Sequence, residues 1–393
     1  MSEFGTTGSA MAVRLALFYA AVFLFVGVAL PFWPIWLTAK GMSATEIGLL
    51  ITASAWIRIA APAVAAHVAD RRGRRRGVLI FLAGTSLAVH LLFLVAEGFA
   101  ALLAVSILAA IAFNPIIPMG ENMTLLASRE RGFDYGRVRL WGSFAFIVGA
   151  TAGGRMVGDA GADIILWLVL GTLVLTVLAS LAMPETGSPP ARRRVPAAAL
   201  LSEPSMAVFL VTASLIQASH AAAYGFATLA WRDSGIGDDV IGLLWAEGVL
   251  AEIVLFALGG GLAARLGPAR LLAVAAVAGI VRWLGFAIEP GLGLLVFLQA
   301  LHALTFGAAH LGAMLYIVRS VPPEHSASAQ ALYSGAAMGL VMGGATILAG
   351  ALYDDVGAGA FYAMAAMSAG GLIGALALGR LTPSAARSAG TRA

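Results

Sequence analysis

The feature that most constrains this chain is a near-continuous series of apolar segments, each long enough to cross a bilayer as a helix. The 393 residues are 60% hydrophobic and only 11% charged, whereas soluble domains carry about 25% charged residues. A membrane-spanning helix needs about 20 consecutive apolar residues. Because spans of that length consume most of the chain, we expect one polytopic, all-α membrane domain with no separate soluble domain.

Twelve such segments are separated by short polar linkers. Their expected bounds are Val13–Leu37, Ile47–His67, Val78–Ala96, Leu102–Ala127, Leu140–Gly158, Ile164–Met183, Met206–Leu229, Ile241–Ala263, Leu271–Ile288, Leu292–Val318, Ala327–Leu352 and Gly359–Leu378. The region between the sixth and seventh spans contains adjacent prolines and three consecutive arginines. It predicts a linker at residues 184–205 between two six-helix halves, residues 1–183 and 206–393.

Basic residues gather in alternate linkers. The even-numbered linkers and the C-terminal tail hold most arginines: Arg71, Arg72, Arg74, Arg75, Arg76, Arg129, Arg131, Arg137, Arg192, Arg193, Arg194, Arg265, Arg270, Arg319, Arg380, Arg387 and Arg392. The odd-numbered linkers hold little beyond Lys40 and Arg232. The positive-inside rule therefore predicts cytoplasmic even linkers and cytoplasmic termini in a bacterial inner membrane. The net charge of +4 thus follows topology and does not indicate a nucleic-acid partner.

An internal repeat supports the division into halves. Shifting the chain by 194 residues aligns Gly41 with Gly235 and the Ile-Gly-Leu-Leu run at Ile47 with the same run at Ile241. Two similar membrane halves predict a parallel repeat, with a binding site between the halves at mid-depth.

The linker between spans 2 and 3 contains a recognisable motif, Asp70-Arg71-Arg72-Gly73-Arg74-Arg75. At the same 194-residue offset, Arg265 and Gly267 repeat its Arg and Gly, while Ala264 replaces the acid. The motif matches the D-R-x-G-R-R hallmark of the major facilitator superfamily, which the chain resembles over twelve spans. That resemblance implies a gating role for these linkers, through Asp70, Arg71, Gly73 and Arg74 in the first half.

Five ionisable side chains are expected inside the apolar spans: Arg58, Glu121, Glu247, Glu252 and Arg282. An ionised side chain at a helix centre costs about 2.5–3.5 kcal/mol on insertion scales, so such residues face a water-filled cavity or pair with one another. They predict a substrate or proton path. The alternative is a buried ion pair that only fixes helix packing.

Polar residues accompany these charges on two spans. On an α-helix, Gln217, His220 and Tyr224 would share one face of span 7. His302, Phe306 and His310 would lie within about 80° of one another on span 10. The spacing predicts two polar helix faces in the second half.

A longer match begins at Asp134-Tyr135-Gly136-Arg137-Val138-Arg139. This segment is similar to the signature at the start of span 5 in lactose-permease-like proton symporters, and most similar to the 3-phenylpropionate permease branch. Further matches include Leu30-Pro31-Phe32-Trp33, Val281-Arg282-Trp283 and Gln330-Ala331-Leu332-Tyr333. Their order and spacing cover essentially the whole chain.

The resemblance carries roles onto individual residues. Glu121 and Arg139 stand where lactose permease has its substrate-binding carboxylate and guanidinium, and Arg282 and His302 match its proton-coupling arginine and histidine. Two positions depart from that pattern. Thr305 replaces the carboxylate that follows the histidine, and the acid of span 8 falls at Glu252, one turn from the lactose permease position.

These departures make Glu252 the candidate proton carrier, with Arg282 controlling proton release and His302 or His310 as a relay. A bound carboxylate needs a cation, which Arg58, Arg139 or Arg282 would supply. An aromatic ring needs a flat apolar wall, for which Tyr19, Trp56, Tyr224, Trp245 and Phe306 are candidates. The full set expected to bind substrate is Arg58, Glu121, Arg139, Tyr224, Trp245 and His220.

Several chemistries have no matching motif. The chain contains no Cys, which excludes disulfides and thiol-based metal sites. Lys40 is the only lysine, and no phosphate-binding loop or H-E-x-x-H motif occurs. We therefore expect a non-enzyme without cofactor or metal, driven by an ion gradient.

The resulting prediction is a functional monomer in the lipid bilayer that transports a small organic acid, such as 3-phenylpropionate, together with H⁺. Proton symport of a sugar or nucleoside and proton-coupled drug efflux are the alternatives within transport. A non-transporting membrane receptor is the alternative outside it.

Overall fold

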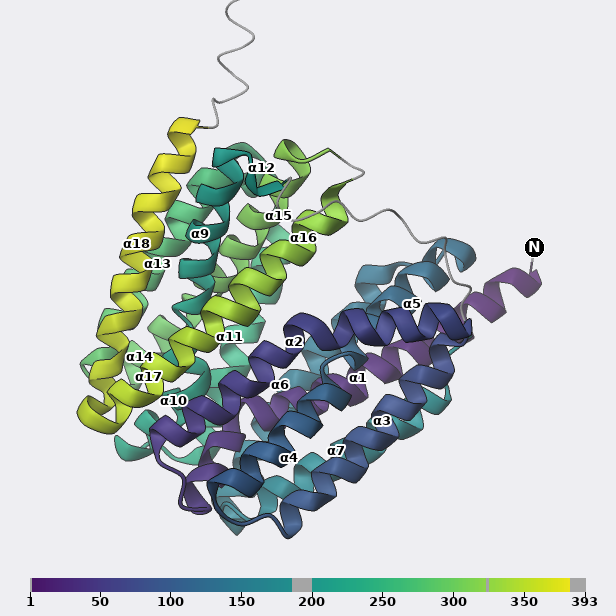
Figure 1. Cartoon of the computed structure of the whole chain (residues 1–393), viewed down its shortest axis with the longest axis horizontal. Helices are drawn as coiled ribbons and strands as arrows, with labels where there is room; N and C mark the ends of the chain where they lie inside the picture. The colour runs from purple at the N-terminus through teal and green to yellow at the C-terminus, as the bar shows by residue number, and fades with distance from the viewer. Residues whose placement is uncertain (1, 186–199, 323–324, 382–393) are drawn as a thin grey trace, which may run out of the picture. The chain divides into compact units, whose positions relative to one another are not determined.

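A computed structural model describes residues 2–185, 200–322 and 325–381 (Figure 1). All regular structure in these ranges is helical. The first helices are α1 (Ser2–Ala39), α2 (Ala44–Arg72), α3 (Arg75–Leu91), α4 (Gly98–Phe113), α5 (Ile116–Arg131), α6 (Tyr135–Ala160) and α7 (Ile164–Leu181). The second series comprises α9 (Pro204–Ala218), α10 (Ala221–Asp233), α11 (Asp238–Leu258), α12 (Gly260–Leu266), α13 (Pro268–Ala287), α14 (Leu292–Ala300), α15 (Ala309–Ser320), α16 (Ser326–Tyr333), α17 (Met342–Val356) and α18 (Ala360–Leu381).

Ten segments of the described ranges are long and apolar enough to cross a membrane. The last, Ser326–Leu381, is 56 residues long and holds both the eleventh and the twelfth predicted spans. The fifth predicted span, in α6, is missing from the ten because Arg155 and several glycines make it less apolar. Counting the long segment twice and adding α6 gives the twelve predicted crossings, and the all-α membrane fold is confirmed.

The contacts divide the chain into two compact units. Unit 1 comprises residues 1–191 and 224–249, and unit 2 comprises residues 192–223 and 250–393. These units differ from the predicted halves in residues 224–249, which pack with the first series of helices. Of the predicted linker at residues 184–205, residues 186–199 lie outside the described ranges, and the division into sequence halves stays a prediction.

Close packing between α6 and α11 accounts for this difference. A Cβ atom added at Gly154 would lie 3.1 Å from the Cα atom of Gly242. One added at Gly242 would lie 3.3 Å from the Cα atom of Gly154. Only residues without a side chain allow two helix backbones to approach this closely. The first part of α11 therefore belongs with unit 1.

The 194-residue repeat is visible in the backbone. Gly41 and Gly235, which the repeat aligns, both have φ of 82°. Gly73 and Gly267 form a second aligned pair with positive φ, 60° and 76°, but their ψ angles are 19° and 173°. Residues with a Cβ atom rarely adopt a positive φ, so glycine is favoured at these turns between helices. The first pair thus has the same φ, whereas the chain turns differently at Gly73 and at Gly267.

Several predicted spans are interrupted, where continuous helices were expected. Span 4 is divided at Asn114–Pro115 between α4 and α5, because a proline cannot donate a backbone hydrogen bond. Span 7 is divided at Ser219–His220 between α9 and α10. Two further spans contain π-helical stretches, η2 (Ala303–Ala308) and η4 (Ser334–Val341). Such stretches are frequent at functional sites.

Candidate functional site

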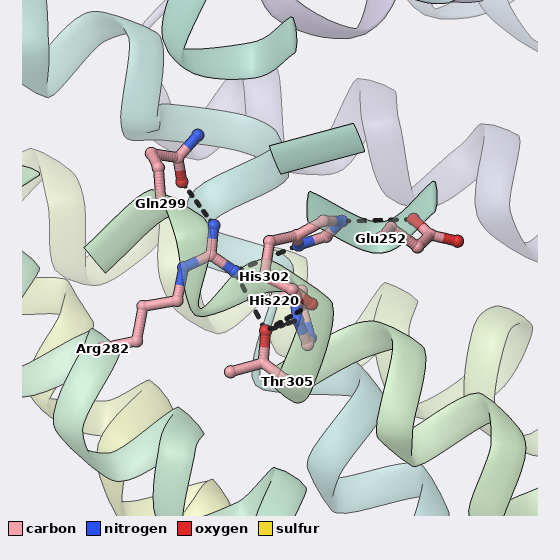
Figure 2. A network of polar contacts seen from close by, with 6 residues as sticks. All are labelled: His220, Glu252, Arg282, Gln299, His302 and Thr305. Atoms are coloured by element: carbon pink, nitrogen blue, oxygen red, sulfur yellow. Dashed lines mark hydrogen bonds and ion pairs between the residues drawn. The ribbon is translucent and has the colours of Figure 1, made fainter. Parts of the chain in front are cut away.

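A buried polar network in unit 2 centres on Arg282 of α13, whose exposed fraction is 3% (Figure 2). Its Nη1 atom donates to Thr305 Oγ1 at 3.0 Å and to His302 Nδ1 at 3.1 Å. Its Nη2 atom donates to the side-chain oxygen of Gln299. Because guanidinium nitrogens only donate, each of these three partners must present an acceptor. Arg282 therefore sets the direction of every hydrogen bond around it.

The hydrogen-bond partners assign the tautomer of both histidines. His302 accepts from Arg282 at Nδ1, so its ring hydrogen is on Nε2. His220 lies 3.0 Å from the Gln217 carbonyl oxygen through Nδ1, which must therefore donate, and 3.0 Å from Thr305 Oγ1 through Nε2. The Thr305 hydroxyl accepts from Arg282 and donates to His220 Nε2. Both imidazoles are neutral in this arrangement.

Glu252 of α11 lies at the other end of His302. Its Oε2 atom is 3.8 Å from His302 Nε2, the nitrogen that carries the hydrogen. The Glu252 side chain is 20% exposed and the His302 side chain 13%. The network thus runs from a partly exposed carboxylate to a fully buried guanidinium, as Figure 2 shows. A carboxylate at such a position is able to exchange a proton with water.

Aromatic rings enclose the buried end of the network. The Arg282 guanidinium lies 4.8 Å from the ring centre of Trp283 and 5.4 Å from that of Phe286. Trp283 is fixed in turn by its Nε1 atom, which donates to Ser219 Oγ at 3.0 Å. Rings stabilise a guanidinium through their negative faces and exclude water from it. Arg282 is thereby held charged away from solvent.

His310 follows His302 and Phe306 along the tenth predicted span. Phe306 stacks on His302 at 5.4 Å and on His310 at 6.4 Å between ring centres. The predicted alignment of these three side chains is therefore present, although η2 replaces a regular α-helix. A ring of phenylalanine separates the two histidines, and it carries no titratable proton.

The three residues predicted to share one face of span 7 have different partners. Gln217 donates to the Tyr333 hydroxyl at 3.2 Å and His220 joins the Arg282 network. Tyr224 instead stacks on Trp245 in unit 1, with ring centres 6.3 Å apart. An interruption at Ser219–His220 lies between α9, which carries Gln217, and α10, which carries Tyr224.

A second acid–base cluster lies in unit 1. The Tyr135 hydroxyl donates to Glu121 Oε1 at 2.7 Å, and Arg139 Nε is 3.9 Å from the same oxygen. The Arg139 guanidinium lies 4.1 Å from the ring centre of Phe23 and 5.3 Å from that of Tyr19. The side chains of Arg139 and Glu121 are 31% and 41% exposed. Water reaches Arg139 and Glu121, so a ligand is able to replace that water and contact both side chains.

A third group in unit 1 brings together three predicted substrate residues. Arg58 of α2 interacts electrostatically with Tyr224 of α10. Tyr224 stacks on Trp245, whose Nε1 atom donates to Thr228 Oγ1 at 2.9 Å. The two stacked rings offer a flat wall for the ring of a ligand, and Arg58, which is exposed, offers a cation for a carboxylate. Trp56, a further candidate for this wall, is 46% exposed.

The motif of the first linker forms a polar clasp between helices. Gly73 ends α2 in the left-handed conformation. Arg75, the first residue of α3, donates to Asp70 Oδ1 at 2.8 Å and to Asn122 Oδ1 of α5 at 2.7 Å. Arg71 and Arg74 are exposed. The clasp therefore acts through Asp70 and Arg75.

The aligned linker of unit 2 is held differently. Gly267 lies between α12 and α13, and Arg265 is exposed. Arg319 of α15 donates to the backbone oxygen of Ala264 at 2.9 Å. Ala264 is the residue that replaces the acid under the repeat. A backbone carbonyl thus takes the place of the missing carboxylate.

Sequence reasoning missed several partners in these clusters. Gln299 and Asn122 are polar residues inside apolar spans, a signal that would have flagged them. Tyr135 and Arg75 belong to the motifs that begin at Asp134 and Asp70. No rule of sequence spacing connects Tyr135 to Glu121 or Arg75 to Asn122. No group of three or more His, Asp or Glu that would hold a metal ion occurs in the described part of the chain.

Long apolar helices with charged side chains inside them are typical of polytopic membrane transporters, and comparisons with known proteins agree. A family model described as "MFS_1 like family" matches residues 12–377. The chain is 32% identical over 340 residues to the "Probable 3-phenylpropionic acid transporter" of Escherichia coli (strain K12), covering 86% of this chain and 89% of that protein. It is 24% identical to the maltose permease of Geobacillus stearothermophilus, covering 85% of this chain and 86% of the permease.

Solved structures show the same fold. The nucleoside transporter NupG superposes with a TM-score of 0.81 at 17% identity, covering 94% of this chain and 98% of NupG. A bacterial homologue of the lysosomal transporter Spinster gives a TM-score of 0.71 at 13% identity, covering 96% of this chain and 94% of the homologue. The protein is thus a transporter of the major facilitator type and not an enzyme. The chain belongs to the MFS_1 like family.

Proposed function

We propose that this chain is a proton-coupled symporter that imports a small aromatic carboxylate, such as 3-phenylpropionate, by alternating access. The observation that carries the proposal is the buried network from Glu252 through His302 to Arg282. Intramembrane ionisable residues are costly and mark functional paths. A network whose donors and acceptors are directional, with one partly exposed carboxylate, has the chemistry of a proton site.

The proton step follows from the assigned tautomers. While Arg282 donates to Nδ1 of His302, that ring has no lone pair to accept a further proton. A proton entering from water therefore binds the Glu252 carboxylate. His302 accepts it only after the contact with Arg282 opens. Protonation of Glu252 and movement of Arg282 are thereby linked.

The substrate step rests on Arg58, Tyr224 and Trp245. Arg58 would hold the carboxylate of the substrate, and the two stacked rings would hold its phenyl group. The name of the 32%-identical relative, a probable 3-phenylpropionic acid transporter, supports this class of substrate. The same helix, α11, carries Trp245 and, seven residues later, Glu252.

The proposal includes location and assembly. Arginines concentrated in the even-numbered linkers support the bacterial inner membrane with both termini in the cytoplasm. Each of the three polar clusters is formed by residues of a single chain, which supports a functional monomer.

Uptake of 3-phenylpropionate into proteoliposomes tests the proposal. We expect accumulation under an inward proton gradient and its loss when an ionophore collapses that gradient. Glu252→Gln should abolish accumulation while retaining exchange of labelled substrate. The amide of glutamine has the shape of the glutamate carboxyl group, but it does not take up or release a proton. The matched control is Glu247→Gln, five residues earlier on α11 and about 140° around the helix, which should keep gradient-driven accumulation.

Two results would overturn the proposal: full accumulation by Glu252→Gln, or no uptake by a well-folded wild-type protein.

Proton symport of a sugar is a second candidate. The exposed Glu121–Arg139 pair favours this candidate. A carboxylate accepts and a guanidinium donates hydrogen bonds, so the two side by side are able to bind the hydroxyl groups of a sugar. Uptake of labelled maltose under the same proton gradient distinguishes the two, since only a sugar symporter would accumulate it.

A further inference from the structure

A groove in unit 1 is separate from the three polar clusters. It lies between α2 and α3 with its floor at the α4–α5 junction, and its volume is about 830 Å³. Val64 of α2 and Phe81 of α3 line it and are 62% and 70% exposed. Ile57, Ala61 and Pro115 are further lining residues. The groove is therefore apolar along most of its length.

Two cations stand at one end of this groove. Arg72, the last residue of α2, and Arg74, directly before α3, both line it and are exposed. No ion pair joins either side chain to an acid within the residues that the structure describes. The adjacent Arg75, by contrast, is paired with Asp70. The groove thus has an apolar body and an unneutralised positive end.

The dimensions match one leaflet of a bilayer. From Ile57 to Arg72, fifteen helical residues extend about 22 Å, and half of the hydrocarbon core is about 15 Å thick. The remaining length of the groove reaches the headgroup region, where basic side chains attract anionic lipids. A soluble phosphate would use only the charged end and leave the apolar length empty.

We propose that an anionic glycerophospholipid binds in this groove, with an acyl chain between α2 and α3 and its phosphate at Arg72 and Arg74. The lipid would pack against the outer side of the Asp70–Arg75–Asn122 clasp, since Arg72 and Arg74 flank Gly73 in the same linker. The site does not depend on which substrate the protein transports.

Native mass spectrometry of the detergent-solubilised full chain, titrated with phosphatidylglycerol or phosphatidylcholine, tests the proposal. We expect one phosphatidylglycerol to bind more tightly than phosphatidylcholine. The double variant Arg72→Gln/Arg74→Gln should lose about fivefold in affinity for each arginine removed. Ala61→Phe, which fills the groove without changing charge, should weaken binding severalfold. Gly77→Leu provides a second groove-filling variant, because a Cβ atom there meets only ordinary contacts.

The matched control is Arg129→Gln/Arg131→Gln, which removes two arginines from the last turn of α5. It should bind phosphatidylglycerol as the wild type does. Equal losses in the control and the test variant would overturn the proposal, because general electrostatics would then explain binding. Displacement of the lipid by inorganic phosphate, or unchanged affinity in both groove-filling variants, would overturn it as well, because only the headgroup would then be bound.

Discussion

Arg282 in unit 2 and Arg139 in unit 1 have the same side chain but lie in different environments. Each guanidinium lies over two aromatic rings. Arg282 is buried and donates to Gln299, His302 and Thr305. Arg139 is 31% exposed and faces one carboxylate, at 3.9 Å.

The difference shows what burial does to an intramembrane charge. A buried acceptor that loses its donor pays the full desolvation penalty, whereas water replaces a lost partner at an exposed pair. The Arg282 network therefore has one well-defined arrangement that changes as a whole. The Arg139 pair is able to rearrange around a ligand. The Arg282 network is therefore suited to proton coupling, and the Arg139 pair is suited to ligand binding.

The largest expected effect separates the two sites by one conservative change. Arg282→Lys should reduce gradient-driven uptake at least about thirtyfold, because an ammonium cannot reproduce the planar set of donors and about 2 kcal/mol of buried hydrogen bonding is lost. Arg139→Lys should reduce it less than about fivefold. Initial rates in proteoliposomes, normalised to reconstituted protein, provide the measurement. Equal losses at both positions would remove the distinction.

The next contrast concerns hydroxyl groups. Thr305→Val keeps the shape but removes the group that accepts from Arg282 and donates to His220, so it should destabilise the protein by about 1–3 kcal/mol. Tyr135→Phe should cost less than about 1 kcal/mol, since water reaches Glu121. Denaturant unfolding in one detergent measures both. Thr305→Ser is the control and should restore most of the stability; failure to do so would assign the effect to packing.

The two aligned linkers offer a third contrast. Arg75→Gln leaves both Asp70 and Asn122 without their donor and should cost about 1 kcal/mol, with a severalfold loss of transport. Arg319→Gln removes one exposed bond to a backbone oxygen and should change stability by less than about 0.5 kcal/mol. Melting temperature and uptake rate check the pair. A larger effect at Arg319 would show that the backbone contact of unit 2 is the stronger clasp.

The smallest effect concerns two tryptophans, each fixed by one hydroxyl. Ser219→Ala frees the indole of Trp283, and Thr228→Val frees that of Trp245. Each should cost about 0.6 kcal/mol, the mean for hydrogen bonds inside membrane proteins. Only Thr228→Val should raise the KM for 3-phenylpropionate, because Trp245 belongs to the proposed ring site. Unchanged KM values in both variants would remove Trp245 from that site.

Much of the fold was predictable because the bilayer imposes strong rules. Apolar length fixed the twelve crossings, and the 194-residue repeat anticipated the matching turns at Gly41 and Gly235. The interruptions at Ser219–His220 and in η2 and η4 were not predictable. The polar residues Ser219 and His220 and the glycines in η2 and η4 weaken a regular helix, but they do not specify where the backbone changes, which depends on packing against neighbouring helices.

The candidate site divides along the same line. The sequence by itself determined which spans carry charge, since Glu252, Arg282 and His302 are conspicuous in apolar surroundings. Only the tertiary structure decided that Arg282 meets Gln299 and Thr305, and that Thr305 meets His220, 85 positions away along the chain. The physical reason is that a guanidinium specifies geometry and not a partner. Any acceptor brought within reach by helix packing satisfies it.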